Sequence, residues 1–122
     1  QARQEVVDEA VDKTIEKLKS LPDKEYEEII SQMIVNSVES GTEEIILSPK
    51  DKQRVSSGFI ENINKKLSQK GIDGKMRLSE ETKNISGGFI LKSGDVEINN
   101  SFEAIIRMKR EEVEAQVIKA LF

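Results

Sequence analysis

The sequence predicts an α+β fold, in which a small four-stranded mixed sheet packs against helices. Apolar residues recur at helical spacing in the first and last parts of the chain, and between residues 75 and 99 they alternate instead, as in strands. A β-branched segment at 44–47 is separated from the later strands by a helical stretch, which allows a mixed sheet. With 122 residues, the chain has the length of one ordinary domain.

The first helix is expected over residues 2–19, where one apolar stripe faces away from the charged residues. The stripe consists of Val6, Val7, Ala10, Val11, Ile15 and Leu18. Two interpretations stay open: an amphipathic helix lying on the core of its own domain, or the end of a coiled-coil stalk. Because the sequence begins at Gln1 within this pattern, we expect it to be a piece of a longer protein.

The middle of the chain is expected to hold two more helices and a strand. Pro22 suits the first turn of a helix over 22–40. After a strand at 44–47, Ser48 is placed to cap a helix over 49–69, because a serine side chain accepts an N–H of the first turn.

Three strands and a helix are expected in the last third of the chain. The strands are placed at 75–78, 87–91 and 96–99, and the last two form a hairpin. A final helix is expected over 101–121. Its apolar face consists of Phe102, Ile105, Ile106, Val113, Val117 and Leu121.

The composition excludes several kinds of chemistry. The chain has neither Cys nor His, which excludes disulfide scaffolds and cysteine metal sites and removes the commonest general base and zinc ligand. A net charge of −4 with interleaved signs argues against nucleic-acid binding. No apolar run approaches the roughly 20 residues that cross a bilayer, and no leader pattern is found, so neither membrane insertion nor a secretion signal is expected.

Only glycines and acidic pairs remain as candidates for a catalytic site. Gly87-Gly88 leads into a strand rather than a helix, so we expect a bulge or a close backbone approach instead of a phosphate loop. Adjacent acids on helices point in different directions and indicate a solvated surface rather than a two-carboxylate hydrolase. The sequence therefore predicts no catalytic residue, no cofactor and no metal site.

Charge and apolarity on the last helix suggest a contact surface. Basic residues at 107, 109 and 110 alternate with acids, which indicates a salt-bridged exposed face or, as the alternative, a docking surface for an acidic partner. The apolar end at 120–122 is expected to dock onto its own sheet, with burial against a partner as the alternative.

A longer motif spans the C-terminal third of the chain. It runs from the glycine pair Gly87-Gly88 into an apolar strand, through a short turn into a second apolar strand that ends at Asn99, and through a cap into a helix ending near Phe122. This pattern resembles the C-terminal head of the E subunit of V-type and A-type rotary ATPases. Asn99 stands where many members of that family have Asp.

The resemblance implies a non-catalytic peripheral stalk (stator) component. Residues 1–20 would be the stub of an N-terminal stalk helix, and residues 21–122 the globular head. The stalk helix would form a heterodimer with the small helical G or H subunit, and the head would contact the non-catalytic nucleotide-binding B subunit. The missing N-terminal region would reach the membrane sector, so the implied location is cytoplasmic and peripheral to the membrane.

Interface residues are assigned from their place on the two terminal helices. We expect Val6, Val7, Ala10 and Val11 to face the helical partner. Arg107, Arg110 and Phe122 are expected to face the headpiece or the partner helix. Two alternatives stay open: the regulator of a flagellar or type III export ATPase, which has a similar head, and a small ligand-binding α+β domain.

Overall fold

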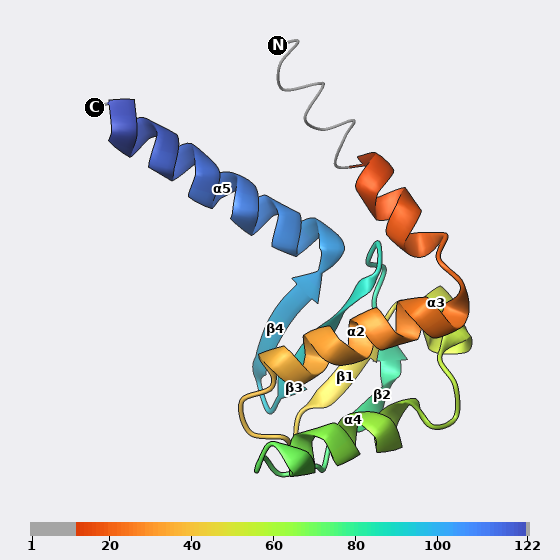
Figure 1. The fold of residues 1–122 in the computed structure, drawn as a ribbon. Helices are drawn as coiled ribbons and strands as arrows, with labels where there is room; N and C mark the ends of the chain where they lie inside the picture. The colour runs from red at the N-terminus through yellow and green to blue at the C-terminus, as the bar shows by residue number, and fades with distance from the viewer. Residues whose placement is uncertain (1–11, 122) are drawn as a thin grey trace.

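Four strands form one mixed sheet, as the sequence predicts, and their order in the sheet is β2-β1-β3-β4 (Figure 1). Their bounds are β1 Glu44–Leu47, β2 Arg77–Thr82, β3 Gly88–Ser93 and β4 Val96–Ser101. β1 runs parallel to β2, whereas β1–β3 and β3–β4 are antiparallel. This computed structural model describes residues 12–121.

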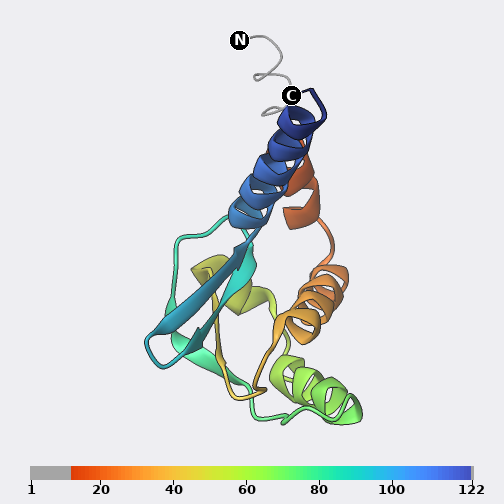
Figure 2. The ribbon, with the colours of Figure 1, turned by 90° about the vertical axis from the view of Figure 1, so that its left-hand side faces the viewer.

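The helices are α2 (Asp23–Ser37), α3 (Pro49–Arg54), α4 (Phe59–Gln69) and α5 (Phe102–Leu121), and residues 12–19 are also helical. Of these, α2 and α4 cover one face of the sheet (Figure 2). In Figure 2, α2 and α4 lie side by side along the sheet, whereas α5 and the helix over 12–19 extend away from it at one end.

The core lies between the sheet and these helices. The helices α2 and α4 bury apolar residues at every fourth position, and the strands bury alternate residues against them. The buried core consists of Tyr26, Ile30, Ile34, Val35, Ile45, Leu47, Phe59, Ile63, Leu67, Met76, Phe89, Leu91 and Phe102. Burial of one such apolar side chain stabilises a fold by about 1.5–3 kcal/mol relative to exposure.

The prediction of one continuous helix over 49–69 is wrong, because the chain leaves the helical conformation between α3 and α4. Val55 has extended backbone angles, φ −75° and ψ 145°. The Ser56 N–H and hydroxyl both donate to the Glu27 carboxylate of α2. Serine and glycine are poor helix formers, so little helix stability is lost where the helix is interrupted at Ser56–Gly58. Ser48 nevertheless caps α3 as predicted, accepting the Asp51 N–H at 3.1 Å.

The second strand begins and ends later than the expected 75–78. The N–H and C=O of Met76 bond the side chain of Asn64 on α4, and the Lys75 N–H donates to Gly41 O at 2.8 Å. The backbone of residues 75–76 is therefore tied to a helix and a loop, and pairing with β1 runs from Arg77 to Thr82.

The glycine pair serves close backbone approach, as expected. Gly87 and Gly88 have φ of +112° and +81°. A Cβ on Gly88 would lie 2.5 Å from the Asn100 carbonyl oxygen, and a Cβ on Gly87 would lie 2.7 Å from the Phe102 ring. The pair thus lets β3 pass next to the junction of β4 and α5.

The final helix begins as predicted but does not fold back. The Ser101 hydroxyl accepts the Ala104 N–H at 3.3 Å and caps α5. Phe102 is buried, whereas Val117 is 51% exposed and Ala120 is exposed. The expectation that the apolar end docks onto its own sheet is therefore wrong for Ala120, and inward burial is wrong for Val117, because α5 leads away from the sheet (Figure 1).

Candidate functional site

The structure describes two of the seven residues expected at a partner interface. Arg107 and Arg110 lie on α5, Arg107 exposed and Arg110 half-buried. The remaining five, Val6, Val7, Ala10, Val11 and Phe122, lie outside the described residues. The predicted salt-bridged face of α5 includes an ion pair between Lys109 and Glu112, with 3.6 Å between nitrogen and oxygen.

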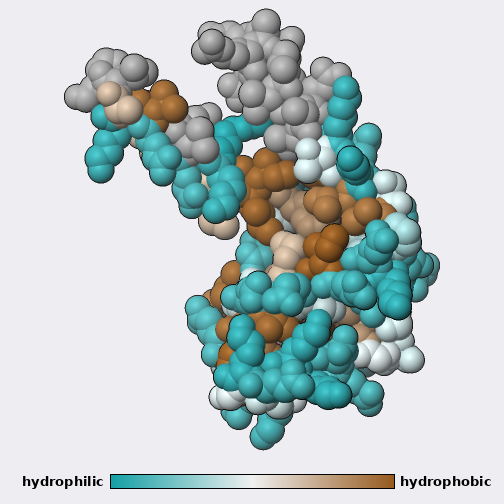
Figure 3. Space-filling model, in the orientation of Figure 1, coloured by the Kyte–Doolittle hydropathy of each residue, from teal (hydrophilic) through white to brown (hydrophobic). Residues whose placement is uncertain are grey.

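The apolar face of α5 continues beyond the head. Phe102 is buried and Ile105 and Ile106 are half-buried, while Val117, on the same helical face, is exposed. Figure 3 shows apolar surface gathered above α2, between the base of α5 and the helix over residues 12–19. An amphipathic helix whose apolar face is only partly covered is suited to packing against another helix.

The base of α5 is held firmly by contacts to the head. The Phe102 ring meets the Tyr26 ring edge to face, with centroids 6.1 Å apart. The Glu103 carboxylate accepts the Ser86 N–H at 3.0 and 3.1 Å. Burial alone raises the pKa of Glu103, but hydrogen bonds from Ser86 and Ser101 outweigh it and lower the pKa, so the carboxylate stays charged.

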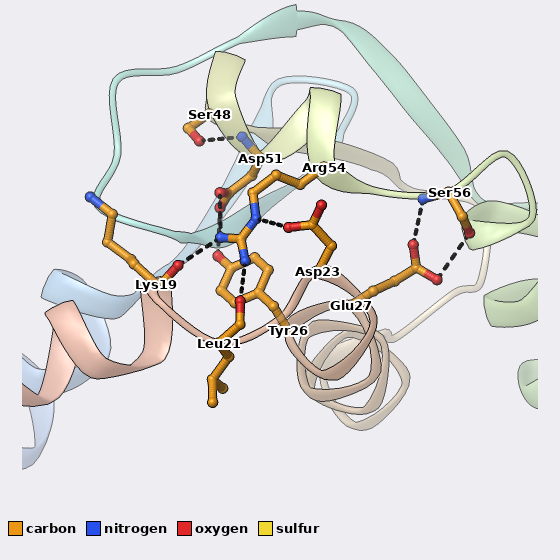
Figure 4. A network of polar contacts seen from close by, with 9 residues as sticks. All are labelled: Lys19, Leu21, Asp23, Tyr26, Glu27, Ser48, Asp51, Arg54 and Ser56. Carbon is orange, nitrogen blue, oxygen red and sulfur yellow. Dashed lines mark hydrogen bonds and ion pairs between the residues drawn. The ribbon is translucent and has the colours of Figure 1, made fainter.

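A second set of contacts joins the helix over 12–19 to the head through Arg54 (Figure 4). Its guanidinium donates from Nη1 to the Lys19 carbonyl at 3.0 Å and from Nη2 to the Leu21 carbonyl at 2.7 Å. Nε donates to the Asp23 carboxylate at 2.7 Å. The side chain is only 12% exposed. Arg54 on α3 therefore binds three acceptors around the break that separates residues 12–19 from α2.

Tyr26 and Asp51 hold Arg54 in place. The guanidinium lies over the Tyr26 ring, 4.4 Å from its centroid, and Nη1 lies 3.9 Å from the Asp51 carboxyl. The Tyr26 hydroxyl donates to Asp51 and accepts the Gly88 N–H. Burial and then the Asp51 hydrogen bond raise the pKa of Tyr26 well above its usual value, so the phenol stays protonated and keeps donating.

The sequence interpretation missed this cluster. It gave no role to Tyr26, Asp51 or Arg54 as a group. The acceptors of Arg54 lie 31 to 35 residues earlier in the chain, so no local spacing could reveal them. Because one helix was expected over 49–69, Arg54 also lay inside a predicted helix, with nothing to mark it as a contact residue.

One open depression lies beside β2. Its volume is about 340 Å³, and its lining consists of Glu44, Arg77, Leu78, Ser79, Glu80 and Glu81. Charged and polar groups dominate this lining, and Arg77 and Glu44 pair with each other at 3.2 Å. Within residues 12–121, no three carboxylates gather as a metal site, and no helix is long and apolar enough to span a membrane.

Comparisons with known proteins show the family to which the chain belongs. The chain matches the family described as ATP synthase (E/31 kDa) subunit over residues 1–122. It is 92% identical over 106 residues to the E subunit of the V-type ATP synthase of Acetivibrio thermocellus, a match covering 87% of this chain and 54% of the relative.

More distant relatives extend the match to the whole chain. The E subunit of the V-type ATP synthase of Clostridium botulinum is 43% identical over all 122 residues, which are 61% of its length. The E subunit of the V-type proton ATPase of Thermoanaerobacter pseudethanolicus is 38% identical over the same span. The chain thus spans between about half and three-fifths of the relatives it matches. It belongs to the ATP synthase (E/31 kDa) subunit family.

Proposed function

We propose that this chain is the head and the stub of the stalk helix, residues 21–122 and 1–20, of a non-catalytic peripheral stalk protein. In a V-type or A-type ATPase it links the nucleotide-binding headpiece to the membrane sector and resists rotary torque during ATP-coupled ion transport. One observation carries this proposal: two helices leave the same end of a small head, and the apolar face of α5 continues past that head (Figure 1).

The proposed helical partner is the small G or H subunit of the stalk, as a heterodimer. The exposed apolar face of α5 gives such a helix a surface on which to pack. Val6, Val7, Ala10 and Val11 are proposed to face the same partner. Arg107 and Arg110 add charge to the surface, and Phe122 follows α5. The basic side chains steer an acidic partner and make the contact sensitive to salt.

The proposed headpiece partner is the non-catalytic B subunit. The part of the longer protein that this chain does not span reaches the membrane sector, which places the protein on the cytoplasmic side, peripheral to the membrane. The family match supports this interpretation over an export-ATPase regulator or a ligand-binding domain.

The proposed role is structural rather than chemical. Gly87 and Gly88 are used to pack β3 against Phe102 and Asn100, not to open a helix at a phosphate. A stator needs a rigid base, and the base of α5 is held by a cap, a ring contact and a carboxylate. We expect a clean sample to show no ATP turnover, whereas measurable hydrolysis at a rate proportional to protein concentration would contradict this role.

Binding measurements test the proposal directly. The 122-residue chain is titrated with the purified B subunit, with and without the G or H subunit, at two salt concentrations. We expect binding that requires or strengthens with the helical partner and weakens with salt. No binding under any of these conditions, by a chain whose fold is intact by circular dichroism, would overturn the proposal.

A pair of α5 variants locates the contact. Val117→Asp places a charge on the apolar face, and Ala115→Asp places the same charge about 200° around the helix. Both positions are exposed, so neither change should alter the fold. We expect Val117→Asp to weaken binding of the helical partner at least tenfold and Ala115→Asp to leave it within about twofold. Equal effects of the two variants would argue against this face.

A further inference from the structure

The helix over residues 12–19 ends with its last carbonyl groups satisfied. The Glu16 and Leu18 carbonyls accept the N–H groups of Ser20 and Leu21, and the Lys17 carbonyl accepts the Ser20 hydroxyl. All of these donors come from the break that directly follows the helix. The Lys19 carbonyl is different, because its donor is Arg54, from α3.

Arg54 is thus a helix cap supplied by another part of the fold. It also donates hydrogen bonds to the Leu21 carbonyl inside the break and to the Asp23 carboxylate at the start of α2. A planar guanidinium donates in fixed directions, so three acceptors bound to it are fixed relative to one another. Its positive charge also suits the C-terminal end of a helix.

The Arg54 guanidinium and its three acceptors, called the clamp below, are anchored in the core. Tyr26 lies under the guanidinium and Asp51 beside it, and the hydroxyl of Tyr26 is tied to β3 through the Gly88 N–H. Ile15 and Leu18 also pack on the core, but apolar contact is not directional. The hydrogen bonds of Arg54 are directional and connect this anchored position to the end of the helix.

We infer that Arg54 fixes the direction in which the helix over residues 12–19 leaves the head. Without the clamp, the helix pivots about Ser20–Pro22 while the head stays folded. In the proposed function, on which this consequence alone rests, Arg54 would keep a stalk helix at a set angle to the head. The inference itself concerns the chain alone, so its test is separate from any partner binding.

Distance measurements between two spin labels test the inference. The chain contains no cysteine, so Asp12→Cys and Glu61→Cys, both at exposed positions, give two unique labels on the 122-residue chain. Asp12 lies nine residues from Leu21, roughly 14 Å along a helix, so a swing of about 30° moves it by roughly 7 Å. Such a movement is easily resolved by pulsed electron spin resonance.

Two variants of Arg54 and one control are compared. Arg54→Met keeps an unbranched stem over Tyr26 but removes every donor, and Arg54→Lys keeps the charge without the planar fork. Arg77→Met is the matched control, because Arg77 is 72% exposed and pairs only at the surface with Glu44. We expect the distance distribution to become at least twice as wide in Arg54→Met and to broaden in Arg54→Lys, with Arg77→Met unchanged.

The outcomes separate a directional role from simple stabilisation. A folded Arg54→Met chain whose distance distribution matches the wild type would overturn the inference, even if its melting temperature were lower. If Arg54→Met does not fold, Arg54→Lys decides: a broadened distribution supports the inference and an unchanged one overturns it. Failure of the chain to bind the B, G or H subunit would leave these distances as they are.

Discussion

A single buried carboxylate organises the connection between α2 and β1. Glu43 is 4% exposed, and its Oε1 accepts the N–H groups of Gly41 and Thr42 at 2.8 and 3.1 Å and the Ser40 hydroxyl at 2.8 Å. Its Oε2 accepts the Glu39 and Ser40 N–H groups at 3.0 and 3.4 Å. This network explains why α2 ends before the expected residue 40, since the backbone from Glu39 to Thr42 wraps around the carboxylate instead.

Glu43 therefore makes stability depend on pH. Burial alone raises its pKa, but the hydrogen bonds from Glu39 and Ser40 outweigh burial and lower the pKa from 4.5 to about 2. Because the folded pKa is depressed, this contribution is complete above the unfolded pKa and is lost as pH falls from about 4.5 toward 2. A shift of this size corresponds to about 3 kcal/mol.

Urea unfolding of Glu43→Gln and wild type at pH 6 and near pH 2.5 measures this contribution. We expect Glu43→Gln to be less stable than wild type by about 2–3 kcal/mol at pH 6, with most of that difference gone near pH 2.5. A difference that stays the same at both pH values would show that the charge of Glu43 does not matter.

Substitutions at Gly88 and Gly71 separate the stability cost of backbone strain from the cost of steric overlap. Their φ angles are similar, +81° and +79°, but a Cβ on Gly88 would overlap the backbone of Asn100 and Ser101, whereas one on Gly71 meets nothing within 4 Å. We expect Gly71→Ala to cost about 1 kcal/mol from strain alone. Gly88→Ala should cost about 2–4 kcal/mol. Equal losses in denaturant unfolding would mean that β4 moves aside freely.

At the scale of elements, the start of α5 at Phe102 (its base) is fixed to the head, whereas its end from residue 115 onward (the arm) is exposed. Phe102 is buried, whereas residues 115–120 are exposed. Deletion of residues 115–122, which removes Leu121 and Phe122, should therefore shift the melting temperature by no more than about 2 °C. We expect the same deletion to weaken binding of the helical partner strongly. Unchanged melting and unchanged affinity together would remove any role for the apolar end.

The base of α5 supplies the control for that deletion. Phe102→Ala removes a buried ring that touches Tyr26, and large-to-small changes of this kind cost about 3–5 kcal/mol. We expect a clear loss of stability in the melting curve, in contrast to the deletion. If the deletion destabilises as much as Phe102→Ala, the arm packs on the head.

Elements held by nearby residues were predictable from the sequence. The bounds of β1, the Ser48 cap and the start of α5 follow from local spacing. The break between α3 and α4 was not predictable, because its acceptor, Glu27, lies on another helix 29 residues away. The Arg54 cluster escaped for the same reason. The helical period of α5 was visible, but period alone does not tell whether an apolar face is covered by the same chain.

At the scale of the whole molecule, a packed head supports two helices that leave from one end (Figures 1 and 2). Arg54 holds the chain just after the helix over 12–19, and Glu103 holds the start of α5. Glu103 binds Ser86, next to the glycine pair, and Arg54 is connected to Gly88 through Tyr26. A load applied to either helix therefore enters the head at neighbouring places. This arrangement supports the proposed stator role.

Hydrogen exchange across the whole chain tests this division into head and arm. We expect the backbone of α2, β1 and β3 to be the slowest to exchange, since these elements carry most of the buried core. The second half of α5 should exchange almost freely in the isolated chain, because a helical segment of roughly 12 residues without packing is marginal in water. Addition of the helical partner should slow exchange there and leave the core unchanged. Slow exchange of the arm in the isolated chain would contradict the exposed arm, and an arm unaffected by the bound partner would assign the contact to another surface.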